Sequence, residues 1–379
     1  MRRKILKAPL PPIIKWAGGK EKELPQIIDN LPTNFINYYE PFVGGGSVYT
    51  AIQAQCSFIN DKCNELMSLL AYIKSQDETF FSWLQLIDDT WSGMLLFAQQ
   101  QKYLVDLYKS YREEKISDID LRTFIQDYTV LQQKKFLSIL PNKFLWLRSI
   151  YIRDIGQNIT RKMFRMKKIE QQKQLLPDAD ICDNIDTAFM SALYMYFRSL
   201  YNDDELKNSH SELFIALFCF IRNYSYSGMF RYNSNGDFNV PYGGIAYNSK
   251  TLSKKIAYYK SAELKALFDR THISNQDFEA FFNDVTPTAE DFIFLDPPYD
   301  SDFSTYAGNE FTRDDQKRLA KYLCEQCKAK WMMVIKYTPF IYSLYADKGL
   351  NIQAFEKQYL VSFMNRNDKK TKHLIITNY

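Results

Sequence analysis

Residues 35–61 read FINYYEPFVGGGSVYTAIQAQCSFIND and carry the pattern that predicts the fold. Two short apolar runs, Phe35–Tyr39 and Cys56–Asn60, flank a glycine turn and a short segment of helical character, Ser47–Gln55. A strand, a helix and a second strand in this order are typical of a parallel α/β sheet. Glycines at the first strand–helix junction would let a ligand approach the backbone and the helix N-terminus closely.

The same alternation of apolar runs and helical periodicity returns near the C-terminal end of the chain. A Thr–Asp pair of the kind that caps helices opens the amphipathic segment Thr312–Lys328. Three apolar or β-branched runs around it are typical of buried strands: Phe292–Leu295, Trp331–Ile335 and Leu374–Thr377. We therefore expect the two ends of the chain to build one sheet together.

The middle of the chain, residues 75–261, differs from both ends. It is rich in aromatic residues, mostly helical in period, and lacks glycine between Gly93 and Gly156. A polar, glycine-rich stretch within it, 222–244, has the alternation expected of a β-hairpin or a long loop. The sequence thus predicts an α/β protein whose Rossmann-like sheet domain, 1–74 and 262–379, receives a mostly helical insertion, 75–261, that carries a hairpin.

The composition places the chain among soluble globular proteins. Of its 379 residues, 46% are hydrophobic and 24% are charged, which excludes wholesale disorder and small disulfide scaffolds. The longest clean apolar run, Leu213–Ile221, is too short to span a bilayer and is interpreted as a buried helix. Prolines interrupt the basic N-terminal segment, which makes it a poor signal peptide. We expect a cytoplasmic protein with no membrane partner.

Cysteine and histidine show no pattern of metal ligands. Cys324 and Cys327 form a lone C-x-x-C without the second ligand pair that a structural zinc site needs. The three histidines are not clustered. We therefore expect no metal site.

The glycine turn at 44–46 is followed by Asp61, at the end of the second predicted strand. A carboxylate at that place can accept hydrogen bonds from both hydroxyls of a ribose. The dinucleotide spacing G-x-G-x-x-G is absent because Val48 and Tyr49 follow the turn, which disfavours a nicotinamide oxidoreductase. The pattern favours an adenosyl ligand, with a purely structural turn as the alternative.

The run 292–299, FIFLDPPY, joins an apolar strand to an aspartate, two prolines and a tyrosine. The strand should bring Asp296 to the carboxyl edge of the sheet, where ligands of open α/β folds bind. The prolines keep the backbone extended and leave its carbonyls without local partners. The aspartate and a proline carbonyl can accept both N–H bonds of an exocyclic amine while Tyr299 stacks on the attached base. A proline-rich surface turn is the alternative.

Together these motifs resemble those of the Dam-type DNA adenine-N6 methyltransferases, which use S-adenosylmethionine. The similarity includes KWAGGK at 15–20, EPFVGGG at 40–46, NQDF at 275–278 and DPPY at 296–299, with the cofactor motifs before the catalytic one. It implies a Rossmann-like methyltransferase sheet in which Asp296, Pro297 and Tyr299 are catalytic. The residues that it implies for cofactor binding are Trp16, Lys20, Glu40, Phe42, Gly44, Gly46, Asp61, Asp277, Phe278 and Asp296.

The polar stretch 222–244 resembles the DNA-reading hairpin of family members that act on GATC and related sites. The similarity implies that Arg231 contacts a guanine edge, as arginine does at O6 and N7. It also implies that Asn239 and Pro241 lie nearby in the major groove and that Tyr226 fills the space left by a flipped base. Lys15 is similarly placed to touch DNA.

The formal net charge of +4 hides a strongly basic segment. From Lys134 to Gln174, eleven Lys and Arg against two acids give +9, so the remainder sums to −5. In a DNA-modifying protein such a segment favours contact with the phosphate backbone over an ordinary solvated face. We expect Arg161, Lys162 and Arg165 to take part.

The sequence therefore predicts a base-flipping enzyme that methylates N6 of adenine in double-stranded DNA, in a GATC-like site. Two alternatives stay open: a cytosine-N4 DNA methyltransferase and a catalytically inactive DNA-binding relative. A monomer is expected, because one cofactor site and one flipped base suffice. Pairing with a restriction endonuclease of the same specificity is compatible with the sequence.

Overall fold

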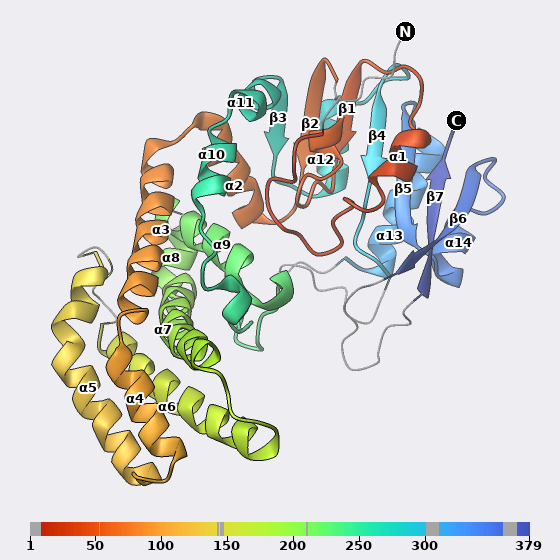
Figure 1. Cartoon of the computed structure of the whole chain (residues 1–379). Helices are drawn as coiled ribbons and strands as arrows, with labels where there is room; N and C mark the ends of the chain where they lie inside the picture. The colour runs from red at the N-terminus through yellow and green to blue at the C-terminus, as the bar shows by residue number, and fades with distance from the viewer. Residues whose placement is uncertain are drawn as a thin grey trace. The chain divides into compact units, whose positions relative to one another are not determined.

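The computed structural model describes residues 9–52, 54–141, 144, 148–209, 211–300, 311–358 and 370–379 (Figure 1). The chain divides into two compact units. The first combines Met1–Ser75 with Tyr259–Tyr379, and the second is Gln76–Tyr258. The roles that we expect for the two parts of the chain, catalysis and target recognition, stay predictions.

A seven-stranded sheet forms the centre of the first unit, with strand order β3-β2-β1-β4-β5-β7-β6 (Figure 1). The pairs formed among β1 to β5 are parallel, whereas β7 is antiparallel to both β5 and β6. The predicted Rossmann-like sheet is confirmed. Its strands are β1 Asn37–Glu40, β2 Cys56–Asn60, β3 Thr271–Ser274, β4 Phe292–Leu295, β5 Lys330–Lys336, β6 Asn351–Gln358 and β7 Lys370–Thr377.

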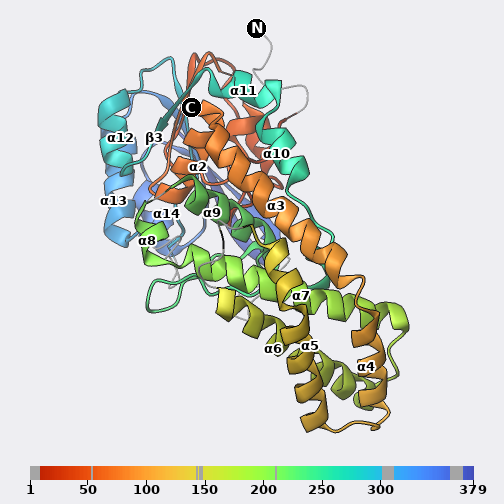
Figure 2. The ribbon, with the colours of Figure 1, turned by 90° about the vertical axis from the view of Figure 1, so that its left-hand side faces the viewer.

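The sheet is buried because helices cover it. Side chains from α12, α13 and α14 join one apolar cluster with β4 and β5, and Figure 2 shows these three helices on the same side of the sheet. All four residues of β4 are buried, as expected for a central parallel strand. The helices of this unit are α1 Leu24–Asp29, α2 Asn64–Ser75, α11 Ala262–Phe268, α12 Phe278–Val285, α13 Arg313–Lys321 and α14 Pro339–Tyr345, with the 3₁₀ turn η1 Tyr49–Ala51 and the π-helical η5 Tyr322–Gln326.

The segment after the glycine turn differs from the prediction. Instead of a helix over Ser47–Gln55, the structure has only the 3₁₀ turn η1. Every residue from 47 to 52 is buried, so this segment has no solvent face of the kind that an amphipathic surface helix presents. The hydroxyl of Thr50 also donates to the Gly46 carbonyl at 2.9 Å, which ties the turn to the glycines.

The second unit is helical, and aromatic side chains form much of its core. Helices α3, α7 and α9 pack against one another, and α6 packs against both α5 and α7. Phe220 lies 5.3 Å from Trp91 and 5.0 Å from Phe197, centroid to centroid, which accounts for part of the high aromatic content. The elements are α3 Glu78–Ala98, α4 Lys102–Arg112, α5 Asp118–Ile139, α6 Arg148–Gln172, α7 Asp178–Tyr201, α8 Asp204–Ser209, α9 Glu212–Tyr224, η3 Tyr226–Gly228, η4 Ile245–Tyr247 and α10 Ser253–Tyr259, the last of which ends at the unit boundary.

The apolar run Leu213–Ile221 lies inside α9, where it is buried, so its interpretation as a core helix is confirmed. Over the residues that the structure describes, no helix is long and apolar enough to cross a membrane. The predicted hairpin is present as a loop that folds back on itself. Two isolated antiparallel bridges, Ser225 with Tyr242 and Tyr232 with Phe238, hold it together without longer strands.

Candidate active site

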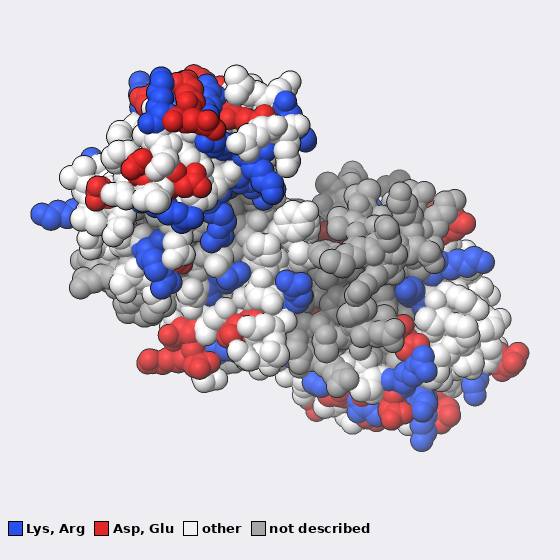
Figure 3. Space-filling view, turned by 90° about the horizontal axis from the view of Figure 1, so that it is seen from below, with Lys and Arg blue, Asp and Glu red and all other residues white. Residues whose placement is uncertain are grey.

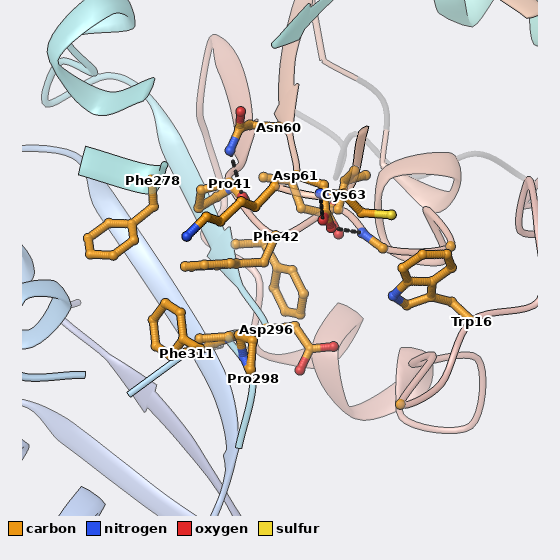
Figure 4. Close-up of a pocket in the computed structure, with 18 of the residues that line it drawn as sticks. Trp16, Pro41, Phe42, Asn60, Asp61, Cys63, Phe278, Asp296, Pro298 and Phe311 are labelled. Atoms are coloured by element: carbon orange, nitrogen blue, oxygen red, sulfur yellow. Dashed lines mark hydrogen bonds between the residues drawn. The ribbon is translucent and has the colours of Figure 1, made fainter. Parts of the chain in front are cut away.

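A pocket opens in the first unit at the carboxyl ends of β1, β2 and β4 (Figure 4). Its walls come from six separate stretches of the sequence. In Figure 4, Phe278 and Phe311 lie at one end and Trp16 at the other, with Asp61 and Asp296 between them. The lining includes residues 16–20, 40–45, 47–48, 60–63, 276–278, 296–299, 311 and 315, together with Phe294.

The glycine turn forms one wall of the pocket. Gly44 has φ +48°, and a Cβ atom there would lie 2.8 Å from Cδ1 of the Trp16 indole, so only glycine fits. The Gly44 N–H donates to Asp61 Oδ2 at 3.0 Å, and the Cys63 N–H donates to the other carboxylate oxygen at 3.0 Å (Figure 4). Burial raises the pKa of Asp61, and these two donors oppose that effect.

Glu40, at the end of β1, is a second buried carboxylate in the pocket wall. The Tyr38 hydroxyl donates to its Oε2 at 2.6 Å. Burial raises the pKa of Glu40 well above its ordinary value, and this hydrogen bond only partly offsets the shift.

Lys20 connects the N-terminal motif to the DPPY motif. Its side chain is buried, and its Nζ donates to the Gly18 carbonyl at 2.9 Å and to the Tyr299 hydroxyl at 3.2 Å. It also forms an ion pair with Asp296 Oδ2. An adjacent ammonium favours the charged form of a carboxylate, which can then only accept hydrogen bonds.

Three phenylalanines form an aromatic corner of the pocket. Phe42 lies 5.8 Å from Phe278 and 5.6 Å from Phe311, and Phe278 and Phe311 are 5.9 Å apart, all between ring centroids. These rings offer apolar surface on which a planar group can stack. The predictions did not include Phe311. Its position directly before Thr312, which caps α13, is the only sequence signal for it, because apolar residues often precede helix caps.

The structure brings nearly all the residues expected to bind cofactor or catalyse the reaction to this pocket. Gly46 is the exception: it is absent from the lining and lies against Ile13 and Tyr49 instead. Asn60, Cys63 and Phe311 line the pocket although they were not predicted. Among the described residues there is no group of three or more His, Cys, Asp or Glu that could hold a metal ion.

A comparison with protein families decides the class of the chain. The model of the D12 class N6 adenine-specific DNA methyltransferases matches residues 16–362, a range that includes every segment of the pocket. The chain belongs to this family. It is therefore an adenine-specific DNA methyltransferase, and its substrate is DNA.

Individual relatives agree with this class. Type II methyltransferase M.MjaIII of Methanocaldococcus jannaschii is 27% identical over 389 residues, which cover 97% of this chain and 99% of the relative. Type II methyltransferase M.CviBI of Paramecium bursaria Chlorella virus NC1A is 33% identical over 199 residues, or 50% of this chain and 72% of the relative. The DNA adenine methylase of Escherichia coli K12 is 30% identical over 141 residues, or 34% and 44%.

The loop of this methyltransferase that resembles a DNA-reading hairpin brings together four of the predicted DNA-binding residues. Arg231 is exposed, and its Nε donates to Asn239 Oδ1 at 3.0 Å. The Tyr226 N–H donates to the Pro241 carbonyl at 2.8 Å, and the Tyr226 side chain is 47% exposed. Lys15, in the first unit, is exposed as well.

The basic segment contains the end of α5 and the whole of α6, and the three expected residues, which lie on α6, differ. Arg161 and Arg165 are exposed, whereas Lys162 is half-buried and donates to Asn184 Oδ1 at 3.4 Å. Burial lowers the pKa of Lys162, with the neighbouring Arg165 acting in the same direction. A groove between α5 and α6 is lined by Arg161, by Arg153 from the same basic segment, and by Arg122, which lies outside that segment and was not predicted. Its described lining residues include no acidic side chain.

Proposed function

We propose that this methyltransferase transfers a methyl group from S-adenosylmethionine to N6 of an adenine that is flipped out of double-stranded DNA. The observation that carries the proposal is the juxtaposition of Asp296, Pro297 and Tyr299 with one pocket that also contains Asp61 and an aromatic corner. When bound, S-adenosylmethionine supplies an electrophilic methyl group. The chain itself supplies binding, orientation and electrostatics.

The donor set of the pocket fits the chemical parts of S-adenosylmethionine. Asp61 presents carboxylate oxygens of the kind that accept bonds from ribose hydroxyls. Phe278, with Phe42 and Phe311, presents rings suited to an adenine face. The Asp296 carboxylate suits the cationic methionine end, beside Trp16 and Lys20, and the buried carboxyl group of Glu40 adds hydrogen-bond acceptors there. Asp277, at the N-terminus of α12, completes the adenine side of the pocket.

The DPPY segment is proposed to hold the target adenine. Asp296 and the Pro297 carbonyl accept the two N–H bonds of the N6 amine, and Tyr299 stacks on the ring. The amine lone pair would then be less delocalised, and it could attack the methyl carbon of a bound S-adenosylmethionine as the sulfonium S–C bond breaks and leaves a neutral thioether. One proton would leave the nitrogen and pass to solvent water. Fixing the amine in line with the methyl group supplies much of the rate enhancement.

Target recognition is proposed to lie in the second unit. Arg231, held by Asn239, is suited to bidentate bonds with a guanine, as a GATC-like site offers. Tyr226 is exposed and available to fill the gap left by a flipped adenine, with Pro241 and Lys15 as further contacts. In Figure 3, blue Lys and Arg side chains are spread over the left-hand part of the surface, which belongs to this unit, among red Asp and Glu side chains.

The α5–α6 groove is proposed to bind the DNA phosphate backbone. Arg122, Arg153 and Arg161 line it with glutamine, serine and threonine side chains, the residue types that contact phosphates. Arg165 is exposed on the same helix and adds to the positive charge. Lys162 is half-buried and uses one of its three N–H donors on Asn184, so we propose a smaller contribution from it. The enzyme acts as a cytoplasmic monomer, and the Type II names of two relatives favour a matching restriction endonuclease as partner.

Product analysis tests the proposed function. Purified protein is incubated with methyl-labelled S-adenosylmethionine and plasmid, and the DNA is digested to nucleosides. We expect label in N6-methyladenine for the wild type, none for Asp296→Ala, and normal transfer for Asp269→Ala, which removes an exposed carboxylate on α11's C-terminal side. Label in N4-methylcytosine would overturn the adenine assignment, and activity in Asp296→Ala would overturn the catalytic role.

A further inference from the structure

Helix α13 begins beside the pocket and contacts two of its segments. Phe311, in the aromatic corner, directly precedes the Thr312 cap, whose hydroxyl accepts the Asp315 N–H at 3.3 Å. A capping box with Asp315 fixes the start of the helix, so the side chains that follow have defined directions. Two of them, Gln316 and Arg318, reach different walls of the pocket.

Gln316 reaches the DPPY segment. Its side chain is 1% exposed, and its Nε2 donates to the Pro298 carbonyl at 2.7 Å. Pro297 and Pro298 have no N–H groups, and β4 has already ended at Leu295, so no ladder of strand hydrogen bonds continues through the motif. A buried donor from outside the motif is therefore what holds this carbonyl and the peptide plane next to Tyr299.

Arg318 reaches the opposite wall. Its Nη2 donates to both carboxylate oxygens of Asp277, at 3.1 and 3.0 Å, and its Nη1 donates to Glu279 at 2.9 Å. The guanidinium carbon lies 4.8 Å from the centre of the Phe278 ring, within the range of a cation–π contact. One side chain thus holds both residues that the proposed function assigns to the cofactor adenine.

We propose that Gln316 and Arg318 are positioning residues: Gln316 sets the DPPY segment for catalysis, and Arg318 sets Asp277 and Phe278 for cofactor binding. This inference rests on the proposed function and adds two residues to it. Neither residue is assigned contact with the reacting atoms. Because both side chains project from one capped helix, α13 fixes the position of the catalytic wall relative to the adenine-binding wall.

The two contacts predict effects on different kinetic parameters. Gln316 contacts the segment that holds the target amine, so its loss should lower kcat and leave the KM for S-adenosylmethionine unchanged. Arg318 contacts the segment assigned to the cofactor, so its loss should raise that KM and the corresponding Kd. Losing a buried hydrogen bond or a charged one costs on the order of a factor of 10 in either quantity.

The experiment compares Gln316→Met, Arg318→Met and the matched control Lys317→Met in the full-length enzyme. Lys317 lies between the two on the same helix, is 60% exposed and pairs only with Asp314 among the described residues. We expect a kcat about tenfold lower for Gln316→Met, a KM and calorimetric Kd about tenfold higher for Arg318→Met, and wild-type values for Lys317→Met. Arg318→Lys should recover only part of the affinity, since an ammonium lacks the guanidinium fork.

A fifth variant, Gln316→Glu, tests whether Gln316 acts through its hydrogen bond or only by filling space. In Gln316→Glu the side chain keeps its size but, when ionised, cannot donate to the Pro298 carbonyl. The protonated carboxyl can donate, and burial favours that form. We therefore expect the kcat of Gln316→Glu, relative to the wild type, to rise as the pH falls.

Three results would overturn the inference while the wild type is active: unchanged kcat in Gln316→Met, unchanged KM in Arg318→Met, or kcat and KM shifting together in both. A Gln316→Glu profile parallel to that of the wild type would do the same, even if Gln316→Met failed to fold. A wild-type protein that transfers no label to adenine would instead contradict the proposed function.

Discussion

Glu40 shows how a single buried carboxylate makes stability depend on pH. It is 2% exposed, and burial outweighs the Tyr38 hydrogen bond, so its pKa lies well above the ordinary value of 4.5. A group whose pKa is raised on folding adds stability that is complete below its unfolded pKa. That stability is lost as the pH rises through the folded pKa.

Replacing Glu40 by Gln should remove the loss of stability that the wild type suffers as the pH rises, because the glutamine amide does not ionise. The free energy of unfolding of Glu40→Gln, minus that of the wild type, is expected to increase from about pH 5 to about pH 8. Urea unfolding of the cofactor-free protein at several pH values measures it. Glu263→Gln, at an exposed site, is the control and should give a flat difference. A flat difference for Glu40→Gln would mean that Glu40 does not resist ionisation.

Individual site residues were predictable from sequence where the signal is local. Asp61 and Asp296 each follow an apolar strand, and the carboxyl ends of parallel strands meet at one edge. The ion pair between Lys20 and Asp296 joins residues 276 positions apart, so no local pattern indicates it. Gln316 was missed for a related reason, since only the fold brings it to the carbonyl of Pro298.

Among the elements, the central strands were predicted well and the outer ones were not. The runs β4 and β5 are buried and apolar, which makes them visible in the sequence. The strands β3 and β6 lie at the two edges of the sheet, where one side lacks a partner strand and burial is incomplete. Their weaker hydrophobic pattern explains why the sequence did not indicate them.

Gly45, in the glycine turn, and Gly93, in helix α3, should respond oppositely to replacement by alanine. A Cβ atom at Gly45 would lie 2.5 Å from the Ile14 carbonyl oxygen, so backbone would have to move. A Cβ atom at Gly93, within α3, would lie 3.7 Å from the nearest side-chain atom, an ordinary contact. Gly45→Ala should therefore destabilise the protein by roughly 1–3 kcal/mol. Gly93→Ala should stabilise it by about 0.5–1 kcal/mol, because alanine suits a helix interior better.

Chemical denaturation of both glycine variants, with the wild type beside them, provides the measurement. Equal stability of Gly45→Ala and the wild type would show that the N-terminal segment can shift away from the glycine turn without cost. A destabilised Gly93→Ala would show that the contact with Ile139 is tighter than 3.7 Å implies.

At the scale of the whole molecule, the net charge indicates a DNA-binding region only when it is calculated segment by segment. The total of +4 combines a segment of +9, from 134 to 174, with a remainder of −5. The structure refines this further, because Lys162 faces Asn184 while Arg122, outside that segment, lines the α5–α6 groove. Sequence could locate the basic segment, but the residues that share a groove depend on how two helices pack.

The groove predicts how DNA binding depends on salt. Each phosphate contact that is lost lowers the slope of log K against log salt concentration by about 0.9, so replacing Arg122, Arg153 and Arg161 with Gln should lower it by roughly 2–3. The control removes the same charge by replacing Lys134, Lys135 and Lys173, which are exposed and outside the groove. Fluorescence anisotropy with duplex DNA at several salt concentrations gives both slopes. A smaller fall is expected for the control, because these lysines act through the net charge alone. Equal falls in the two triple variants would mean that the DNA responds to the charge of the unit and not to the groove.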